Sequence, residues 1–302
     1  MDASVDELLA AWGIRTRDVR PVGEGTNNTS WYVGDDFVLR IHRNTRPPQY
    51  EHALLHALHG LSFDVPTPLP AEDGRTLVRR ELHGEPVTAS LSRRIRGEHP
   101  RRGDAVQAEA CGEALAELDL ALAGIDPATL PPPRVWDGDL TKVHARVPDL
   151  DAMVASLEGA DRRQEVARIL AATAGVGRGL PQSIIHADFW PTNVLLDGSS
   201  VTGVLDFEAA GPGFRAMDLA IGLWSFGADT HDAFRRGYLA RLPLTDVEQD
   251  AVPALQLLRE ATSLVHWYGR HLEGLTTAAD ITARADRLRQ VAAVRRTGAS
   301  RP

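Results

Sequence analysis

Cysteine and lysine are almost absent from this 302-residue sequence. The one cysteine, Cys111, excludes an internal disulfide and is typical of a reducing compartment, so we expect a cytoplasmic protein. The one lysine is Lys142, which leaves 32 arginines among the 33 basic residues. Because no lysine precedes Lys142, a permanently charged anion contact in residues 1–141 must use arginine.

The sequence also lacks an excess of positive charge and long apolar runs. A net charge of −8 argues against a nucleic-acid partner and gives no attraction to an anionic membrane. No apolar run reaches transmembrane length, and the acidic start of the chain is neither a signal nor a transit peptide. A length of 302 residues indicates two lobes, and we expect a monomer or a homodimer.

One stretch, from Ile184 to Ala220, concentrates polar residues at regular intervals. His186 stands two residues before Asp188, and Asn193 follows five residues after that aspartate. Two apolar runs around an Asp-Gly turn then predict a β-hairpin, and the second run ends at Asp206. Because a hairpin brings its ends together, we expect Asn193 and Asp206 to lie side by side.

These residue types suit phosphoryl transfer. Asn193 and Asp206 offer hard oxygen ligands for Mg²⁺, which needs few protein ligands because phosphate oxygens complete its shell. Asp188 is placed to accept a hydroxyl proton, and His186 to stiffen the loop. This is the H-x-D-x-x-x-x-N plus Asp arrangement of kinases. The alternative is that these are turn and cap residues, because Asp and Asn favour turns.

Three segments carry a resemblance to a known family: His186-Ala-Asp-Phe-Trp-Pro-Thr-Asn193, Val204-Leu-Asp-Phe207 and Arg215-Ala-Met-Asp-Leu-Ala220. They resemble the aminoglycoside phosphotransferase and choline kinase-like superfamily, and within it the branch around type II homoserine kinases. The resemblance extends more weakly over nearly the whole chain.

The resemblance implies an α+β, two-lobed protein-kinase-like fold with MgATP between the lobes. Residues 1–83 are the expected N-lobe, an antiparallel sheet plus one helix that covers the nucleotide. Residues 84–302 are the expected helical C-lobe with the catalytic loop and the acceptor pocket. The resemblance also implies that Asp218 braces the catalytic loop, and that adenine hydrogen-bonds to the backbone of Arg80 and Leu82 in a hinge.

The N-terminal part predicts three short strands with a glycine-containing loop between the first two. Gly23, Gly25 and Asn27 of this loop are candidates for covering phosphate, because glycine lets backbone approach closely; a plain hairpin turn is the alternative. On the strand Phe37–Ile41, Arg40 occupies the place of the usual kinase lysine, paired with Glu51 of the next helix. The alternative is a solvent-facing arginine at a strand edge.

Further along, Thr76–Arg80 is predicted to be the last strand of the N-terminal sheet. His52, His56 and His59 could mimic a zinc site, but a solvated helix face is the preferred interpretation. Asp104 is expected to cap a helix that ends near Ala123. Its apolar stripe is expected to be core: Val106, Cys111, Leu115, Leu118 and Leu122. Aromatic residues and histidines between Ala261 and Leu272 either belong to the core or line an acceptor pocket.

The sequence therefore predicts an ATP- and Mg²⁺-dependent kinase that phosphorylates a hydroxyl of a small molecule. A homoserine-like amino alcohol is the preferred acceptor. An aminoglycoside would require several carboxylates, and five are available: Glu208, Asp229, Asp232, Glu260 and Glu273. The missing lysine leaves open a catalytically inactive nucleotide-binding module. A hydrolase is disfavoured because the chain lacks Gly-x-Ser-x-Gly.

Overall fold

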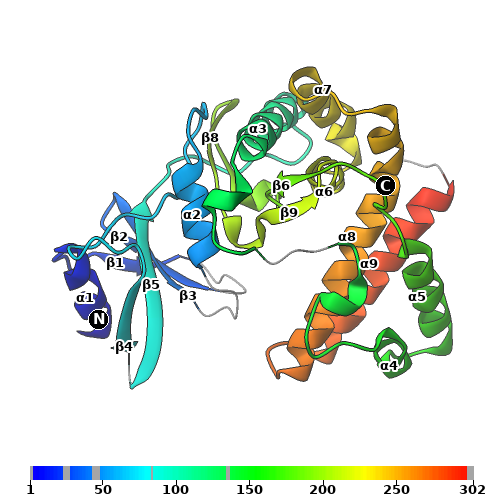
Figure 1. The fold of residues 1–302 in the computed structure, drawn as a ribbon, viewed down its shortest axis with the longest axis horizontal. Helices are drawn as coiled ribbons and strands as arrows, with labels where there is room; N and C mark the ends of the chain where they lie inside the picture. Colours follow the sequence, from blue (N-terminus) through cyan, green and yellow to red (C-terminus); the bar gives the residue numbers. More distant parts are fainter. Residues whose placement is uncertain (1–2, 23–27, 43–47, 83, 134–136, 298–302) are drawn as a thin grey trace. The chain divides into compact units, whose positions relative to one another are not determined.

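The computed structural model describes residues 3–22, 28–42, 48–82, 84–133 and 137–297. The chain forms two compact units (Figure 1). Unit 1 comprises residues 1–100, 124–133 and 192–210, and unit 2 comprises residues 101–123, 134–191 and 211–302. None of the described helices is long and apolar enough to cross a membrane.

Unit 1 contains a five-stranded antiparallel sheet in the order β1-β2-β3-β5-β4. Its helices and strands are α1 (Ala3–Leu9), β1 (Val19–Pro21), β2 (Thr29–Val33), β3 (Phe37–His42), α2 (Gln49–Ala57), β4 (Val78–Leu82), β5 (Glu85–Arg93), β7 (Val194–Asp197) and β8 (Ser200–Val204). The predicted early strands, the helix near residue 50 and the central hairpin are thus present.

Alternation along the strands decides which side chains enter the core of unit 1. Leu39 and Ile41 of β3 are buried, and they cluster with Leu91 of β5 and with Leu8 and Leu9 of α1. Helix α1 therefore covers one face of the sheet (Figure 1). Because successive strand side chains point to opposite faces, Arg40 projects from the other face.

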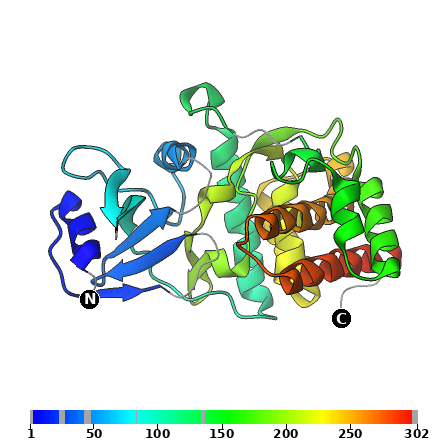
Figure 2. The ribbon, with the colours of Figure 1, turned by 90° about the horizontal axis from the view of Figure 1, so that it is seen from below.

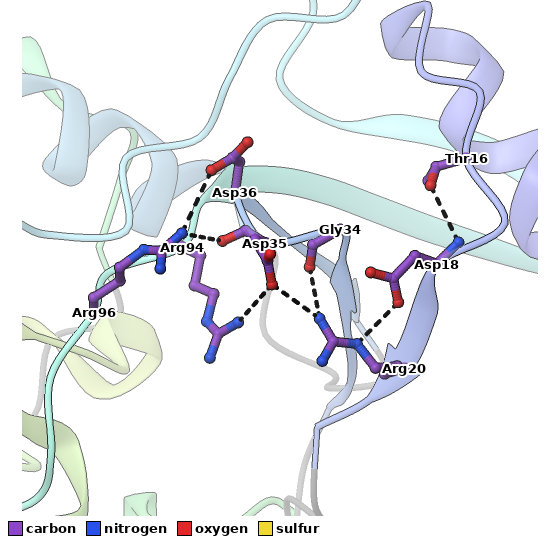
Figure 3. A network of polar contacts seen from close by, with 8 residues as sticks. All are labelled: Thr16, Asp18, Arg20, Gly34, Asp35, Asp36, Arg94 and Arg96. Atoms are coloured by element: carbon purple, nitrogen blue, oxygen red, sulfur yellow. Dashed lines mark hydrogen bonds and ion pairs between the residues drawn. The ribbon is translucent and has the colours of Figure 1, made fainter.

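The turn between β2 and β3 is held by arginines from other parts of unit 1 (Figure 3). Arg20 of β1 donates to the carbonyl of Gly34 at 3.1 Å and to Asp35 at 3.2 Å. Arg94 lies 4.1 Å from the ring centroid of Tyr32 and 3.9 Å from the Asp35 carboxylate. These groups are mostly exposed, so they fix the turn while adding little stability.

The sequence-based prediction that the sheet ends at Thr76–Arg80 is wrong. Strand β5 follows, and it pairs with both β3 and β4, with Leu91 opposite Leu39. The boundary proposed near residue 83 falls between β4 and β5, whereas unit 1 continues to Pro100.

The central hairpin β7–β8 is tied into unit 1 by backbone contacts. Leu196 and Glu98 exchange N–H···O bonds of 2.8 Å in both directions. Asp64 donates to the carbonyl of Thr202 at 2.9 Å and accepts from the N–H of Val204 at 3.1 Å. These bonds anchor both strands of the hairpin that bears Asn193 and Asp206 at its ends.

Unit 2 is mainly helical, and α5, α8 and α9 pack against one another within it (Figures 1 and 2). Its elements are α3 (Ala105–Ala123), α4 (Leu150–Ser156), α5 (Ala160–Thr173), β6 (Gln182–Ile185), β9 (Gly211–Phe214), α6 (Met217–Phe226), α7 (His231–Arg241), α8 (Asp246–Leu272) and α9 (Ala278–Thr297). Strand β9, which pairs antiparallel with β6, was not predicted, because its Gly-Pro-Gly sequence is typical of a break.

Two glycines set the contact between α3 and α7. A Cβ atom added to Gly112 would lie 2.1 Å from the carbonyl oxygen of Phe234, and one added to Gly237 would lie 2.1 Å from that of Glu109. Backbone therefore meets backbone without room for any side chain, and substitution at either position would force the helices apart.

Helix α3 begins as expected, because Asp104 accepts hydrogen bonds from the N–H groups of Val106 and Gln107, both at 3.1 Å. Cys111 is fully buried, and burial raises the pKa of its thiol to about 12. The assignment of Val106 to the core is wrong, since this side chain is 67% exposed. The adjacent Gln107 and Ala108 are buried, and Val106 is exposed because it lies on the other face of the helix.

Candidate active site

Three carboxylates of unit 1 converge on the guanidinium of Arg40. Nη1 donates to Glu51 of α2 at 2.9 Å, and Nη2 donates to Glu208 at 3.1 Å and to Asp206 at 3.3 Å. Asn28 adds a 2.7 Å hydrogen bond from its Nδ2 to Glu208. The predicted Arg40–Glu51 ion pair is thus formed, and Glu208 joins it, although the sequence singled out Glu208 only as a possible contact for a cationic acceptor.

Burial and crowding set the charges of this cluster. Burial opposes the charge on Arg40, but the carboxylates of Glu51, Asp206 and Glu208 raise the pKa of its guanidinium. Burial raises the pKa of Glu51 to about 7 against the attraction of Arg40, and the other two carboxylates raise it further. Since carboxylates outnumber the single guanidinium, the cluster can accept another cation.

The hairpin brings Asn193 and Asp206 to the same end of unit 1. The N–H of Leu205 donates to the carbonyl of Asn193 at 2.8 Å, so Asp206 follows immediately after the paired position. Asp206 has φ 62° and ψ 69°, a left-handed conformation that costs an ordinary residue about 1–3 kcal/mol and marks functional sites when the surroundings enforce it.

The donors of this cluster fit a divalent cation. Among the described residues no three His, Cys, Asp or Glu side chains are grouped so as to hold a metal. Asp206 and Asn193 carry hard oxygens of the kind that Mg²⁺ takes when nucleotide phosphates complete its coordination, so they are the residues that would hold it. The surplus carboxylate charge around Arg40 also favours a bound cation. A bound divalent ion would neutralise phosphate charge there.

The other predicted nucleotide contacts stay predictions. Gly23, Gly25 and Asn27 lie outside the described residues. Arg80 is exposed, and the backbones of Arg80 and Leu82 belong to β4, an edge strand of the sheet. Arg80 is opposite Val87 and Leu82 is opposite Glu85 of β5, so the segment expected to be a hinge belongs to an antiparallel strand pair within unit 1.

The three histidines predicted to share a helix face do not do so, because α2 ends at Ala57, before His59. His56 and His59 are exposed, but His52 is only 5% exposed. Its Nδ1 lies 2.8 Å from the hydroxyl of Thr76, and its ring packs edge-on against His42. Burial lowers the pKa of His52 to about 4. The prediction of solvent exposure is therefore wrong for His52, which is a neutral packing residue.

In unit 2, Asp218 at the start of α6 braces the loop that carries Asp188. Its carboxylate accepts the backbone N–H groups of His186 at 2.6 Å and Ala187 at 2.7 Å. Ala187 has φ 64°, so the loop is held in a strained left-handed conformation. Among the described residues, only Ala187 and Asp206 combine a side chain with a positive φ.

His186 and Asp119 support this loop from inside unit 2. His186 is fully buried and accepts the N–H of Asp188 on Nδ1 at 3.3 Å, which makes it a positioning residue. Asp119 of α3 accepts a 2.7 Å hydrogen bond from the hydroxyl of Tyr238. Burial, then the charge of Asp218, raises the pKa of Asp119 well above its ordinary value.

Asp188 itself is partly exposed and meets an arginine that sequence reasoning missed. Arg259 of α8 donates from Nη2 to Asp188 Oδ1 at 2.9 Å. The two residues are 71 positions apart, so only the packing of α8 against the loop reveals the pair. A partly exposed carboxylate on a braced loop is suited to accept a proton from a bound hydroxyl.

A comparison of sequences decides the family. The profile of the phosphotransferase enzyme family matches residues 18–255, which includes Arg40 and the entire loop from His186 to Asp218. The chain belongs to the phosphotransferase enzyme family. It is accordingly an enzyme, and the ATP-dependent phosphotransferase activity toward an alcohol group that the sequence predicted is the activity of this family.

Relatives of this phosphotransferase include named kinases. A homoserine kinase from Gluconacetobacter diazotrophicus is 33% identical over 255 residues, which cover 78% of this chain and 76% of that protein. One from Pseudomonas aeruginosa is 28% identical over 270 residues, covering 84% and 81%.

Solved structures show the fold. A microcompartment-associated aminopropanol kinase matches with a TM-score of 0.68 at 20% identity, covering 98% of both chains. An aminoglycoside 2′-phosphotransferase in complex with GDP matches with a TM-score of 0.70 at 17% identity, covering 96% of this chain and 97% of that one. The predicted α+β, protein-kinase-like fold of the phosphotransferase is therefore confirmed.

Arg40 gives the first testable prediction for this phosphotransferase. Arg40→Ala should lower kcat/KM for ATP about 10- to 100-fold, because a charge-assisted hydrogen bond contributes about 1.5–3 kcal/mol. Arg40→Lys should recover part of the loss, since an ammonium cannot reproduce the fork. Glu51→Ala acts through the same pair, so the double variant should lose less than the sum of the two single losses.

The matched control is Arg20→Ala, which removes an exposed arginine from β1 of the same sheet and should leave kcat/KM unchanged. Steady-state kinetics with varied ATP measures all variants. Full additivity, or an Arg40→Ala enzyme as active as the parent, would show that Arg40 does not serve the nucleotide.

Proposed function

We propose that this enzyme transfers the γ-phosphoryl group of ATP to the side-chain hydroxyl of a homoserine-like amino acid in the cytoplasm. Asp188 orients that hydroxyl and accepts its proton. Arg40 meets phosphate charge, and Asn193 and Asp206 hold Mg²⁺. The loop of Gly23, Gly25 and Asn27 covers the phosphates, and the backbone of Arg80 and Leu82 receives the base.

The observation that carries the acceptor assignment is the similarity to homoserine kinases along most of both chains. That similarity extends across both units rather than being confined to the phosphate-handling motifs. The aminoglycoside and aminopropanol kinases match at 20% identity or less, a level that reports the fold alone. An amino acid alcohol is therefore the acceptor that the comparisons favour.

The chemistry supports an active enzyme over an inactive nucleotide-binding module. Arg40 stands in the place of the missing lysine, and its pair with Glu51 provides the cation that phosphate requires. Asp188 sits on a loop whose strain is maintained by Asp218, an arrangement that nucleotide binding alone would not need. A bound Mg²⁺ would supply charge neutralisation to the phosphate oxygens.

A panel of acceptors tests the proposal. The full chain is incubated with ATP, MgCl₂ and L-homoserine, L-serine, choline, 1-amino-2-propanol or kanamycin, and ADP release is followed by a coupled assay. We expect kcat/KM for L-homoserine to exceed the others at least about tenfold, since each well-placed polar contact contributes about 1 kcal/mol or more. Phosphorus NMR identifies the phosphate ester. A higher kcat/KM for kanamycin would contradict the assignment.

A further inference from the structure

Three arginines from the two longest helices of unit 2 gather beside the catalytic loop. Arg259 of α8 pairs with Asp188 at 2.9 Å. The neighbouring Glu260 pairs with Arg287 of α9, also at 2.9 Å, and is itself only 2% exposed. The guanidinium of Arg287 in turn lies 4.8 Å from the ring centroid of Trp190, two residues after Asp188. This chain of contacts links the catalytic loop to α9.

Arg284 lies one helical turn before Arg287 on α9, and its environment differs. Its guanidinium carbon lies 4.3 Å from the ring centroid of Trp267 on α8, a cation–π contact that fixes the plane of the group. Within the described part of the chain, no carboxylate forms an ion pair with Arg284. The contact with the ring face leaves the edge of the guanidinium, with its N–H donors, for another group.

Several charged side chains surround Arg284. Burial, then the positive charges of Arg287 and Arg259, lowers the pKa of Arg284 against the opposing pull of Glu260 and Asp280. Asp188 and Glu260 are each paired with one of the other two arginines. The Asp280 carboxylate caps α9 by accepting the N–H and hydroxyl of Thr277, at 2.8 and 2.7 Å. Arg284 is therefore a half-buried cation that forms no ion pair within the described part of the chain.

We propose that Arg284, supported by Arg259 and Arg287, binds a carboxylate of the phosphate acceptor. This inference rests on the proposed kinase function and names the feature by which that site selects its substrate. A guanidinium held flat by an aromatic ring offers two parallel N–H donors, which match the two oxygens of a carboxylate. Arg259 pairs with Asp188, and Arg287 lies over the ring of Trp190 on the same loop, so a carboxylate bound beside these arginines lies near the catalytic loop.

The arrangement selects against cationic acceptors. A substrate with several ammonium groups would be repelled by the guanidinium groups of Arg259, Arg284 and Arg287, and like charges brought together cost several kcal/mol in such sites. A small amino acid instead brings one carboxylate to the guanidinium of Arg284. Trp267, which the sequence left undecided between core and pocket, is here a wall of the acceptor site.

Two fragments of the proposed substrate test this without any chemical step. L-2-aminobutyrate has the carboxylate and amine of homoserine but no hydroxyl, whereas 3-amino-1-propanol has the amine and hydroxyl but no carboxylate. Calorimetry measures the binding of each to the full chain, as the parent and as the Arg284→Gln variant. We expect Arg284→Gln to raise the Kd of L-2-aminobutyrate about 10- to 100-fold, and to change that of 3-amino-1-propanol less than about twofold.

Arg289→Gln is the matched control, since it removes an arginine from the same helix that pairs with Glu165 and Asp286 instead, and it should bind both fragments like the parent. Arg284→Lys should restore part of the affinity, and melting temperatures check that the variants are folded. Equal losses for both fragments, no binding of L-2-aminobutyrate to the parent, or an increase in the KM for ATP alone would overturn the proposal.

The outcomes separate this inference from the proposed function. If the parent binds L-2-aminobutyrate through Arg284 but does not phosphorylate L-homoserine, the carboxylate site stands and the homoserine-like acceptor does not. If L-homoserine is phosphorylated equally well by the parent and by Arg284→Gln, the kinase function stands and the role of Arg284 is refuted.

Discussion

Asp188→Asn should reduce kcat about 10²- to 10⁴-fold, the usual contribution of a positioned general base. Asparagine has the shape of aspartate and can still accept the 2.9 Å hydrogen bond from Arg259. What it cannot do is take up a proton from the acceptor hydroxyl. The loss should therefore appear in turnover, while the affinity for ATP changes little because Asp188 is not a phosphate ligand.

Single-turnover kinetics and calorimetry with ATP distinguish these two effects. Asp232→Asn is the matched control: it makes the same chemical change on unit 2, at a side chain that is 95% exposed, and should behave like the parent. A melting temperature near that of the parent shows that the braced loop is intact. Turnover at close to the parent rate would remove Asp188 from the mechanism.

Local patterns were enough to predict the hairpin that carries Asn193 and Asp206 at its ends. Two apolar runs around a short Asp-Gly turn indicate both strands and their antiparallel pairing. The same holds for α6, whose apolar sequence runs from Met217 to Phe226, and for the Asp104 cap of α3. In each case the residues that decide the structure are near neighbours in the chain.

The missed features depend on distant contacts. Strand β5 begins with Glu-Pro and pairs with β3, so its place in the middle of the sheet comes from long-range register that no local pattern encodes. His52 lies one helical turn before the exposed His56, but Thr76 and His42 contact His52. Periodicity identifies which residues share a helix face, but it does not show which of them the rest of the protein buries.

The candidate site also contains both residues that local patterns predict and residues that depend on distant contacts. The motif found Asp188, Asn193 and Asp206 because their roles depend on spacing along one segment, and alternation along β3 found Arg40. Arg259 and Arg284 remained unassigned, since an arginine on an amphipathic helix is most often solvated. The sequence shows that Arg284 lies three residues before Arg287 and that Arg259 is next to Glu260. It does not show which helices meet the catalytic loop, because the packing decides that.

Asp206→Asn should remove the Mg²⁺ dependence of nucleotide binding and lower kcat about 10²-fold or more, because metal stabilisation of phosphate charge is worth several kcal/mol. Asparagine is chosen over alanine for a conformational reason. Asp206 has φ 62°, a left-handed conformation that asparagine adopts readily, so the variant loses the carboxylate charge without adding backbone strain.

Calorimetry with ATP, with MgCl₂ and with EDTA, measures this effect on the parent and the variant. Asp197→Asn is the matched control, because that exposed aspartate lies at the opposite end of the same hairpin and should retain the Mg²⁺ response. The neighbouring charges should respond as well: the Asp206 carboxylate raises the pKa of Glu51, so its removal should lower that pKa and tighten the pair with Arg40. A parent enzyme that binds ATP equally with and without Mg²⁺, or a variant with the parent's Mg²⁺ response, would show that Asp206 holds no metal.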